Sequence, residues 1–165
     1  MLINDTLEYL LNLQKTIENK RRPESVPDNR HMRMNIQLSC SEDYKFTMFT
    51  RSLITFPEDF TVGLRLDAPN PYFSSTVVLV RFQGPHGGQM ESDHSIHNSY
   101  HIHLYTESDF ARQKNKASYR ESTDKFNSIE GAIVEFLKFC NIQDPYGIFN
   151  EERKRINQIQ FHDLI

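Results

Sequence analysis

The sequence predicts an α+β domain in which helices cover one face of an antiparallel sheet. Five stretches alternate apolar and polar residues, which is the period of a strand with one buried face. Short links join these stretches, as in an antiparallel meander. Segments near both ends of the chain instead place apolar residues at helical spacing. The 165 residues therefore favour a single α+β domain, 1–165, with its own hydrophobic core.

The first element that we expect is a helix over residues 6–19. Asn4 or Asp5 can cap its N-terminus, and its leucines recur on one side of the helix. The next segment, residues 20–31, contains two prolines and many charges. This composition is typical of a loop or linker.

The five expected strands follow in order and form the meander. They are residues 32–38, 44–51, 60–67, 76–83 and 99–105. In the first of them, Met34 and Ile36 alternate with Arg33 and Asn35, and the later strands repeat this pattern. The sheet should therefore have one apolar and one polar face.

The last third of the chain supplies the second helix. Residues 109–126 are charged and poor in large aliphatic side chains, which indicates a loop. Residues 129–141 place Ile133 and Phe136 on an apolar stripe, and residues 151–160 form a short terminal helix in this prediction. The N-terminal helix and the helix over 129–141 carry the stripes that can cover the apolar face.

The composition limits the class of partner. A formal net charge of −3 excludes a strongly basic nucleic-acid-binding protein, although it is compatible with a local basic patch. Cys40 and Cys140 lie far apart in the sequence, so we expect reduced thiols. No window approaches the roughly 18 apolar residues of a membrane span. We therefore expect a cytoplasmic protein with no membrane partner.

Histidines concentrate where the last two strands meet. The strands flank a long polar loop, residues 84–98, which begins with Gly-Pro-His-Gly-Gly around His86. Four of the seven histidines lie in the window 94–103, and two of these, His101 and His103, share one side of a strand. If the protein has chemistry, this is where we expect it.

The polar face of the sheet has two interpretations. An antiparallel sheet can leave one face in water, so its polar residues need no function. Against this, Arg65 and Arg81 bring positive charge to the same face as the two histidines, in a chain of negative net charge. That combination favours a site for a phosphate or another anion.

One hypothesis is acid–base cleavage of a phosphodiester without metal, as in a ribonuclease-like toxin or defence protein. Cleavage of RNA needs a base, an acid and cations that hold the phosphate, and histidine titrates near neutrality. A tyrosine can donate a hydrogen bond or stack on a base. The catalytic set is then His101, His103 and Tyr105, and the substrate-binding set is Arg65, Arg81 and His86.

Two alternatives remain open. The first is a non-catalytic phage, defence or counter-defence factor that holds an anionic ligand, RNA, a nucleotide or a protein partner. The second is a divalent metal site, because His101, His103 and Glu107 share a parity if the strand continues to Glu107. That spacing resembles the first metal motif of cupins, but its flanking glycines are replaced by Ser95 and Lys114. Our first expectation is therefore no cofactor.

Residues 77–107, VVLVRFQGPHGGQ…SYHIHLYTE, also resemble a family of small uncharacterised bacterial proteins. The shared pattern is Arg…Gly-Pro-His…His-x-His-x-Tyr, and this chain carries Gln83 where the family has an acidic residue. The matching residues are Arg81, His86, His101, His103 and Tyr105. The resemblance implies a compact α+β domain, no established activity, and an association with toxin–antitoxin, phage or defence loci.

Overall fold

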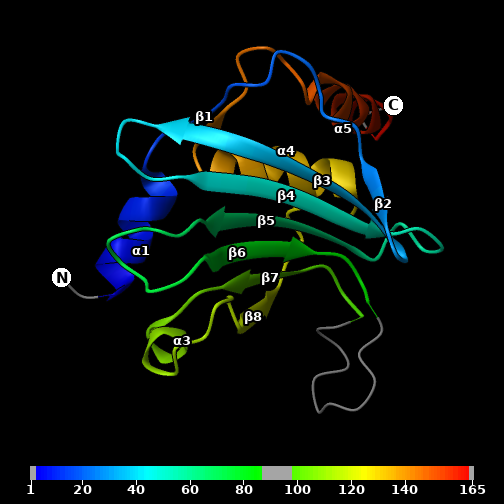
Figure 1. Ribbon diagram of the computed structural model, residues 1–165. Helices are drawn as coiled ribbons and strands as arrows, with labels where there is room; N and C mark the ends of the chain where they lie inside the picture. The colour runs from blue at the N-terminus through cyan, green and yellow to red at the C-terminus, as the bar shows by residue number, and fades with distance from the viewer. Residues whose placement is uncertain (1–2, 87–97, 164–165) are drawn as a thin grey trace.

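The computed structural model describes residues 3–86 and 98–163, and within them it has an α+β architecture of four helices and nine strands (Figure 1). The helices are α1 (Ile3–Asn12), α3 (Glu107–Ala111), α4 (Ile129–Phe139) and α5 (Asn150–His162). The strands are β1 (Lys15–Ile17), β2 (Val26–Asp28), β3 (His31–Cys40), β4 (Phe46–Leu53), β5 (Phe60–Leu66), β6 (Val77–Gln83), β7 (His101–Leu104), β8 (Tyr119–Ser122) and β9 (Ile142–Gln143). The sheet order is β8-β7-β6-β5-β4-β3-β1-β9, with β2 paired to β3.

The predicted meander forms the centre of this sheet. Strands β3 to β7 pair antiparallel, each with the next, as the alternation predicted. The estimate of about five strands is wrong, because β1, β2, β8 and β9 extend the sheet. These additions are two to four residues long and join through backbone hydrogen bonds, so they carry little side-chain signal.

Two segments expected to be loops contribute to the added elements. Residues 20–31 contain β2, and residues 109–126 contain part of α3 and all of β8. The N-terminal helix also ends at Asn12, earlier than expected, because the chain turns into β1. The polar composition of β8, YRES, fits an edge strand that is held by its pairing to β7.

The core lies between the sheet and the helices, with α4 behind the strands in Figure 1. Phe82 of β6 is central to it. Its ring stacks on Phe126 at 5.1 Å and meets Phe136 of α4 edge-on at 5.2 Å. Leu7 and Leu10 of α1 belong to the same cluster, so both predicted helices contribute to covering the apolar face.

A register shift between Leu64 and Arg65 changes how the end of β5 pairs with β6. The shift pairs Leu64 with Val80 and Arg65 with Val78, leaving Leu79 unopposed. Leu79 is buried next to this shift, whereas Val78 is only partly buried.

The described residues also bear on the expectations about thiols and membranes. Cys40 and Cys140 are both free, and burial raises the pKa of the Cys140 thiol to about 12. Cys140 is therefore protonated and inert at neutral pH. In the same part of the chain, no helix has the length and apolar character needed to cross a membrane.

Lys15 links three elements from inside the protein. Its side chain is 0% exposed, and burial lowers its pKa to about 8. Its ammonium donates to the carbonyl oxygens of Leu11 at 3.1 Å, Leu13 at 2.8 Å and Cys140 at 2.9 Å. These carbonyls end α1 and α4, where helices leave backbone acceptors without internal partners. One side chain thus ties both covering helices to β1.

We expect the substitution Lys15→Met to lower the free energy of unfolding by about 2–3 kcal/mol, because methionine fills the space but leaves buried carbonyls without a donor. Urea denaturation measures this loss. Lys154→Met, which removes an exposed lysine paired with Glu151, should change it by less than about 0.5 kcal/mol. Equal stability of the two variants would contradict the role of Lys15.

Candidate functional site

Several of the predicted site residues meet on the outer face of β5 to β8, away from the core. In one row across the sheet, Gly63 pairs with Arg81, Arg81 with His103, and His103 with Arg120. Residues directly opposite in antiparallel strands share a face, so these side chains are neighbours. Gly63 is needed here because a Cβ at this position would lie 2.2 Å from the Phe49 ring.

A second row lies beside the first. Thr61 pairs with Gln83, Gln83 with His101, and His101 with Ser122. The two rows place His101 and His103 on one face, as their spacing predicted, and their ring centroids are 5.0 Å apart.

The expectation that this face lies open to water is wrong at the histidines. His101 is 0% and His103 is 6% exposed. The segment after α3 returns to the sheet at this point. Asn115 accepts a hydrogen bond from Val78, and Ala117 donates one back to it, which holds residues 115–117 along β6. The polar face is therefore partly covered.

Arg81 determines the state of His103. Its Nη2 lies 2.6 Å from the Ala117 carbonyl oxygen and 3.1 Å from His103 Nδ1. A guanidinium can only donate, so His103 Nδ1 accepts and the ring proton is on Nε2. Burial, assisted by Arg81 and His101, lowers the pKa of His103 to about 2. His103 is therefore a neutral hydrogen-bond donor and not an acid–base group.

Two of these donors lack an acceptor. Arg81 Nε and His103 Nε2 are buried and have no hydrogen-bond partner among the described residues. A buried donor left unpaired costs about 1–3 kcal/mol, and such groups are rare in native proteins. These two donors are thus the polar groups on this face that the described residues leave unsatisfied.

Two hollows meet at Arg81 and His103, which line both. The larger measures about 810 Å³. Its described lining includes the cations Arg81, Arg112, Lys114, Lys116 and Arg120 and no carboxylate. We call it the basic hollow. Lys114 is partly balanced from outside the lining by Asp109, at 3.8 Å.

The smaller hollow, of about 370 Å³, contains His86 and shares Arg81 and His103 with the basic hollow. We call it the histidine hollow. Its other lining residues are His31, Arg51, Asp59, Thr61 and Gln83. Arg51 Nη2 lies 2.8 Å from His31 Nε2, and burial together with Arg51 lowers the pKa of His31. His31 therefore accepts from Arg51 as a neutral ring.

His86 and His101 form a hydrogen-bonded pair. His101 Nδ1 lies 2.8 Å from the Ser99 carbonyl oxygen, so Nδ1 carries a proton. In the neutral ring, His101 Nε2 is then the acceptor, and it lies 3.3 Å from His86 Nε2. The Gln83 amide, 3.1 Å from the same nitrogen, can accept from the protonated ring or, when turned, donate to the neutral one. His101 Nε2 thus faces two side chains, His86 and Gln83, each of which can supply either a donor or an acceptor.

The structure thus brings together Arg81, His86, His101 and His103, and it places two other predicted site residues elsewhere. Tyr105 is buried in the core, where its hydroxyl donates to the Lys114 carbonyl oxygen at 2.8 Å. Arg65 lies beyond the register shift, and its Nε donates to Asp67 at 2.7 Å. Tyr105 is therefore not placed to act on a ligand at the histidines.

The proposed metal triad is not formed. β7 ends at Leu104, and Glu107 is an exposed residue in the first turn of α3. The strand cannot continue because Thr106 caps α3, donating its backbone N–H to Asp109 at 3.0 Å. Across residues 3–86 and 98–163, no group of three or more His, Cys, Asp or Glu side chains could hold a metal ion. His94 and His97 lie outside the described residues.

Sequence reasoning missed the cations of the basic hollow. Arg112, Lys114, Lys116 and Arg120 all fall within the segment that was interpreted as a loop. A signal was present, since four cations within nine residues form a local basic cluster in an acidic chain. Only the fold shows that the cluster faces Arg81.

The low pKa of His103 has a measurable consequence for stability. The ordinary pKa of histidine is 6.5, and below that pH the unfolded chain binds a proton at His103 that the folded chain does not. The free energy of unfolding therefore decreases as the pH is lowered. His103→Gln should remove up to about 1.4 kcal/mol per pH unit of this dependence between pH 6 and 4. Urea unfolding at several pH values measures the difference.

Nitrogen NMR gives an independent check of the same prediction in the unmodified protein. At pH 5 the His103 ring should show the neutral form with its proton on Nε2. A protonated ring at that pH, or equal pH dependence of stability in the two proteins, would contradict the assignment.

Comparison with known proteins adds no further assignment. No protein-family model, no curated protein and no solved structure matches this chain. The resemblance to small bacterial proteins therefore stays a prediction from the sequence.

Proposed function

We propose that this protein binds a phosphate-bearing ligand in the basic hollow, with the phosphate on Arg81 and His103. The observation that carries the proposal is the pair of buried donors, Arg81 Nε and His103 Nε2, which have no acceptor among the described residues. The anionic oxygens of a bound phosphate would satisfy them. RNA and nucleotides, the ligands expected from the sequence, carry such oxygens.

The charges around the two donors favour phosphate over a neutral acceptor. The basic hollow adds Arg112, Lys116 and Arg120 to Arg81, and its described lining holds no carboxylate. Hydrogen bonds from cations to anionic oxygens are about twice as strong as neutral ones, and arginine suits phosphate geometry. A phosphate offers several oxygens, so it can meet the buried donors and the rim cations at once.

We expect inorganic phosphate to bind in a saturable way and to bind more weakly as salt is added. Replacing two exposed cations of the hollow, Arg112→Gln with Lys116→Gln, should weaken binding on the order of 10-fold, because two charge-assisted contacts are lost. Titration calorimetry measures the dissociation constant.

Arg33→Gln is the matched control, since Arg33 is exposed on β3 and pairs with Asp28 outside the hollow. Its affinity should equal that of the unmodified protein. Equal weakening by the control, or no saturable binding in the unmodified protein, would refute the phosphate site.

A second candidate function is cleavage of a phosphodiester without metal, and the His86–His101 pair favours it. His86 lines the histidine hollow, which ends on Arg81 and His103, so it would lie beside a phosphate bound there. His101 is fully buried and would act through His86 as a positioning residue. His103 would hold the phosphate and take no part in proton transfer.

On RNA, one histidine pair can both remove and return the single proton that the reaction transfers. His86 removes the proton from a 2′-hydroxyl, the O2′–P bond forms, and the P–O5′ bond breaks. The protonated pair returns the proton to the departing 5′ oxygen. The products are a 2′,3′-cyclic phosphate and a 5′-hydroxyl, and Arg81 would stabilise the charge that develops on the phosphorus oxygens.

His86→Ala should reduce RNA cleavage by roughly 10²–10⁴-fold, because general acid–base catalysis contributes that much. The assay follows cyclic-phosphate ends in the presence of EDTA, which should leave the rate unchanged. His86 is only partly buried, so the variant is expected to fold. His162→Ala, an exposed position on α5, serves as the control. Cleavage that is insensitive to His86→Ala, or absent in the unmodified protein, would refute the catalytic function. It would not affect the proposal that the protein binds phosphate.

The wider biological setting is proposed from the sequence alone. A cytoplasmic protein with reduced cysteines and no membrane partner fits the free thiols and the absence of a spanning helix among the described residues. Roles in toxin–antitoxin, phage or defence systems rest on the sequence resemblance. If phosphate binds and RNA is not cleaved, the non-catalytic binding protein is the better description.

A further inference from the structure

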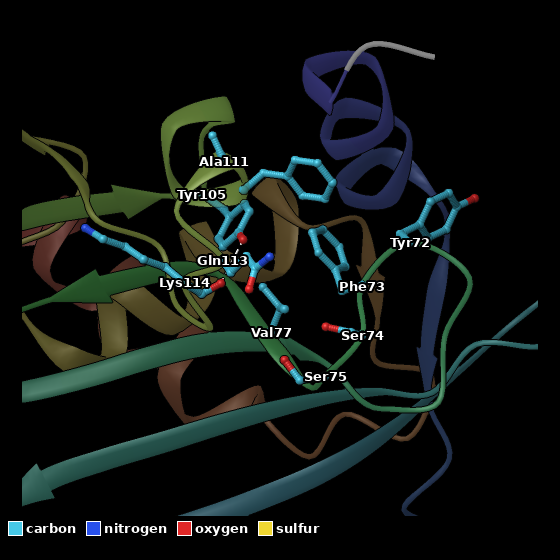
Figure 2. A pocket seen from close by; sticks show the side chains of 10 residues that line it. Tyr72, Phe73, Ser74, Ser75, Val77, Tyr105, Ala111, Gln113 and Lys114 are labelled. Carbon is cyan, nitrogen blue, oxygen red and sulfur yellow. Dashed lines mark hydrogen bonds between the residues drawn. The ribbon is translucent and has the colours of Figure 1, made fainter.

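A third hollow, lined by aromatic rings, shares lining residues with the basic hollow, and Figure 2 shows it from close by. It measures about 410 Å³, and its aromatic residues are Tyr72, Phe73, Tyr105 and Phe110. The Phe73 ring meets Tyr105 edge-on at 5.5 Å and Phe110 at 6.0 Å. We call it the aromatic hollow.

The aromatic and basic hollows share a wall made of Ser75, Gln113 and Lys114. Figure 2 shows Gln113 and Lys114 beside Tyr105. The wall is fixed from behind, because the Lys114 carbonyl oxygen accepts the Tyr105 hydroxyl at 2.8 Å. Gln113 has a φ of 53°, an uncommon conformation for a residue other than glycine or asparagine. A ligand that occupies both hollows would cross this shared wall.

We infer that the aromatic hollow binds the base of a nucleotide whose phosphate lies in the basic hollow. The inference rests on the proposed phosphate site and adds a binding site for the base of the same ligand. Phe110 is 46% exposed, so it offers ring surface for stacking. Every nucleobase has a flat π-face that stacks on such a ring. The Gln113 amide carries both a donor and an acceptor, which suits a base edge.

The position of the aromatic hollow beside the basic hollow favours a nucleotide over a purely apolar ligand. A lipid chain or an apolar peptide would gain nothing from the adjoining cations, whereas a nucleotide joins one flat ring to one anion. Aromatic side chains interleaved with a basic groove are the usual basis of single-strand binding. A free nucleotide and one nucleotide of a single strand share this chemistry, and the test separates them.

The experiment compares three probes by calorimetry: inorganic phosphate, adenosine 5′-monophosphate and a tetra-adenylate strand. The monophosphate should bind on the order of 10-fold more tightly than phosphate, as expected for one stacked base. Phe110→Ala should abolish that gain and leave the affinity for phosphate unchanged. Phe56→Ala is the matched control, because Phe56 is also 46% exposed but does not line the hollow.

Each result decides a different claim. Tighter binding of the tetra-adenylate than of the monophosphate, lost in Phe110→Ala, supports a single strand as the source of the nucleotide, and equal affinity supports a free nucleotide. Monophosphate binding that is no tighter than phosphate, or insensitive to Phe110→Ala, overturns the base subsite while the phosphate site stands. Monophosphate binding that depends on Phe110 without any phosphate binding supports the base subsite and overturns the phosphate site. If no probe binds, both proposals fail.

Discussion

The buried guanidinium of Arg81 is the constraint on which the outer face of the sheet depends. Its Nη2 serves the Ala117 carbonyl oxygen and His103 Nδ1 together, and so joins β6, β7 and the segment that folds over them. Burial lowers the pKa of Arg81, and the carboxylate of Asp109 opposes that effect without an ion pair to it among the described residues. A buried cation of this kind is costly unless a counter-charge reaches it. A bound anion would supply that charge, so the feature that organises this face is also the one on which the proposed phosphate site rests.

Environment separates the roles of histidines that the sequence presents as equivalent. His101 and His103 are two residues apart on one strand, yet the carbonyl of Ser99 faces one ring and the guanidinium of Arg81 the other. The first contact leaves His101 Nε2 to pair with His86, and the second holds His103 neutral. In the proposed function, proton transfer and phosphate binding therefore fall to different rings. The aromatic hollow extends the division, because it places a stacking surface beyond the cations and away from the proton-transfer pair.

Local pattern predicted the parts of this protein that alternate or repeat. The period of two located β3 to β7, and the parity of His101, His103 and Arg81 placed them on one face. The local pattern held no information about where a strand ends, where its register shifts, or which short strands pair at the edge of the sheet. β8 exists through backbone pairing, the cap at Thr106 stops β7 before Glu107, and the shift at Leu64 changes the surroundings of Arg65. The return of residues 115–117 along β6, where Ala117 meets Arg81, is a tertiary event with no local signal.

The most direct test of the account follows the two unpaired donors themselves. In nitrogen-detected NMR of the protein, the Arg81 Nε–H and His103 Nε2–H signals are recorded during a titration with inorganic phosphate at constant ionic strength. The account predicts that both signals move downfield together and saturate with one dissociation constant, while potassium chloride leaves them in place. Saturable phosphate binding that moves neither signal would contradict the claim that these donors hold the anion.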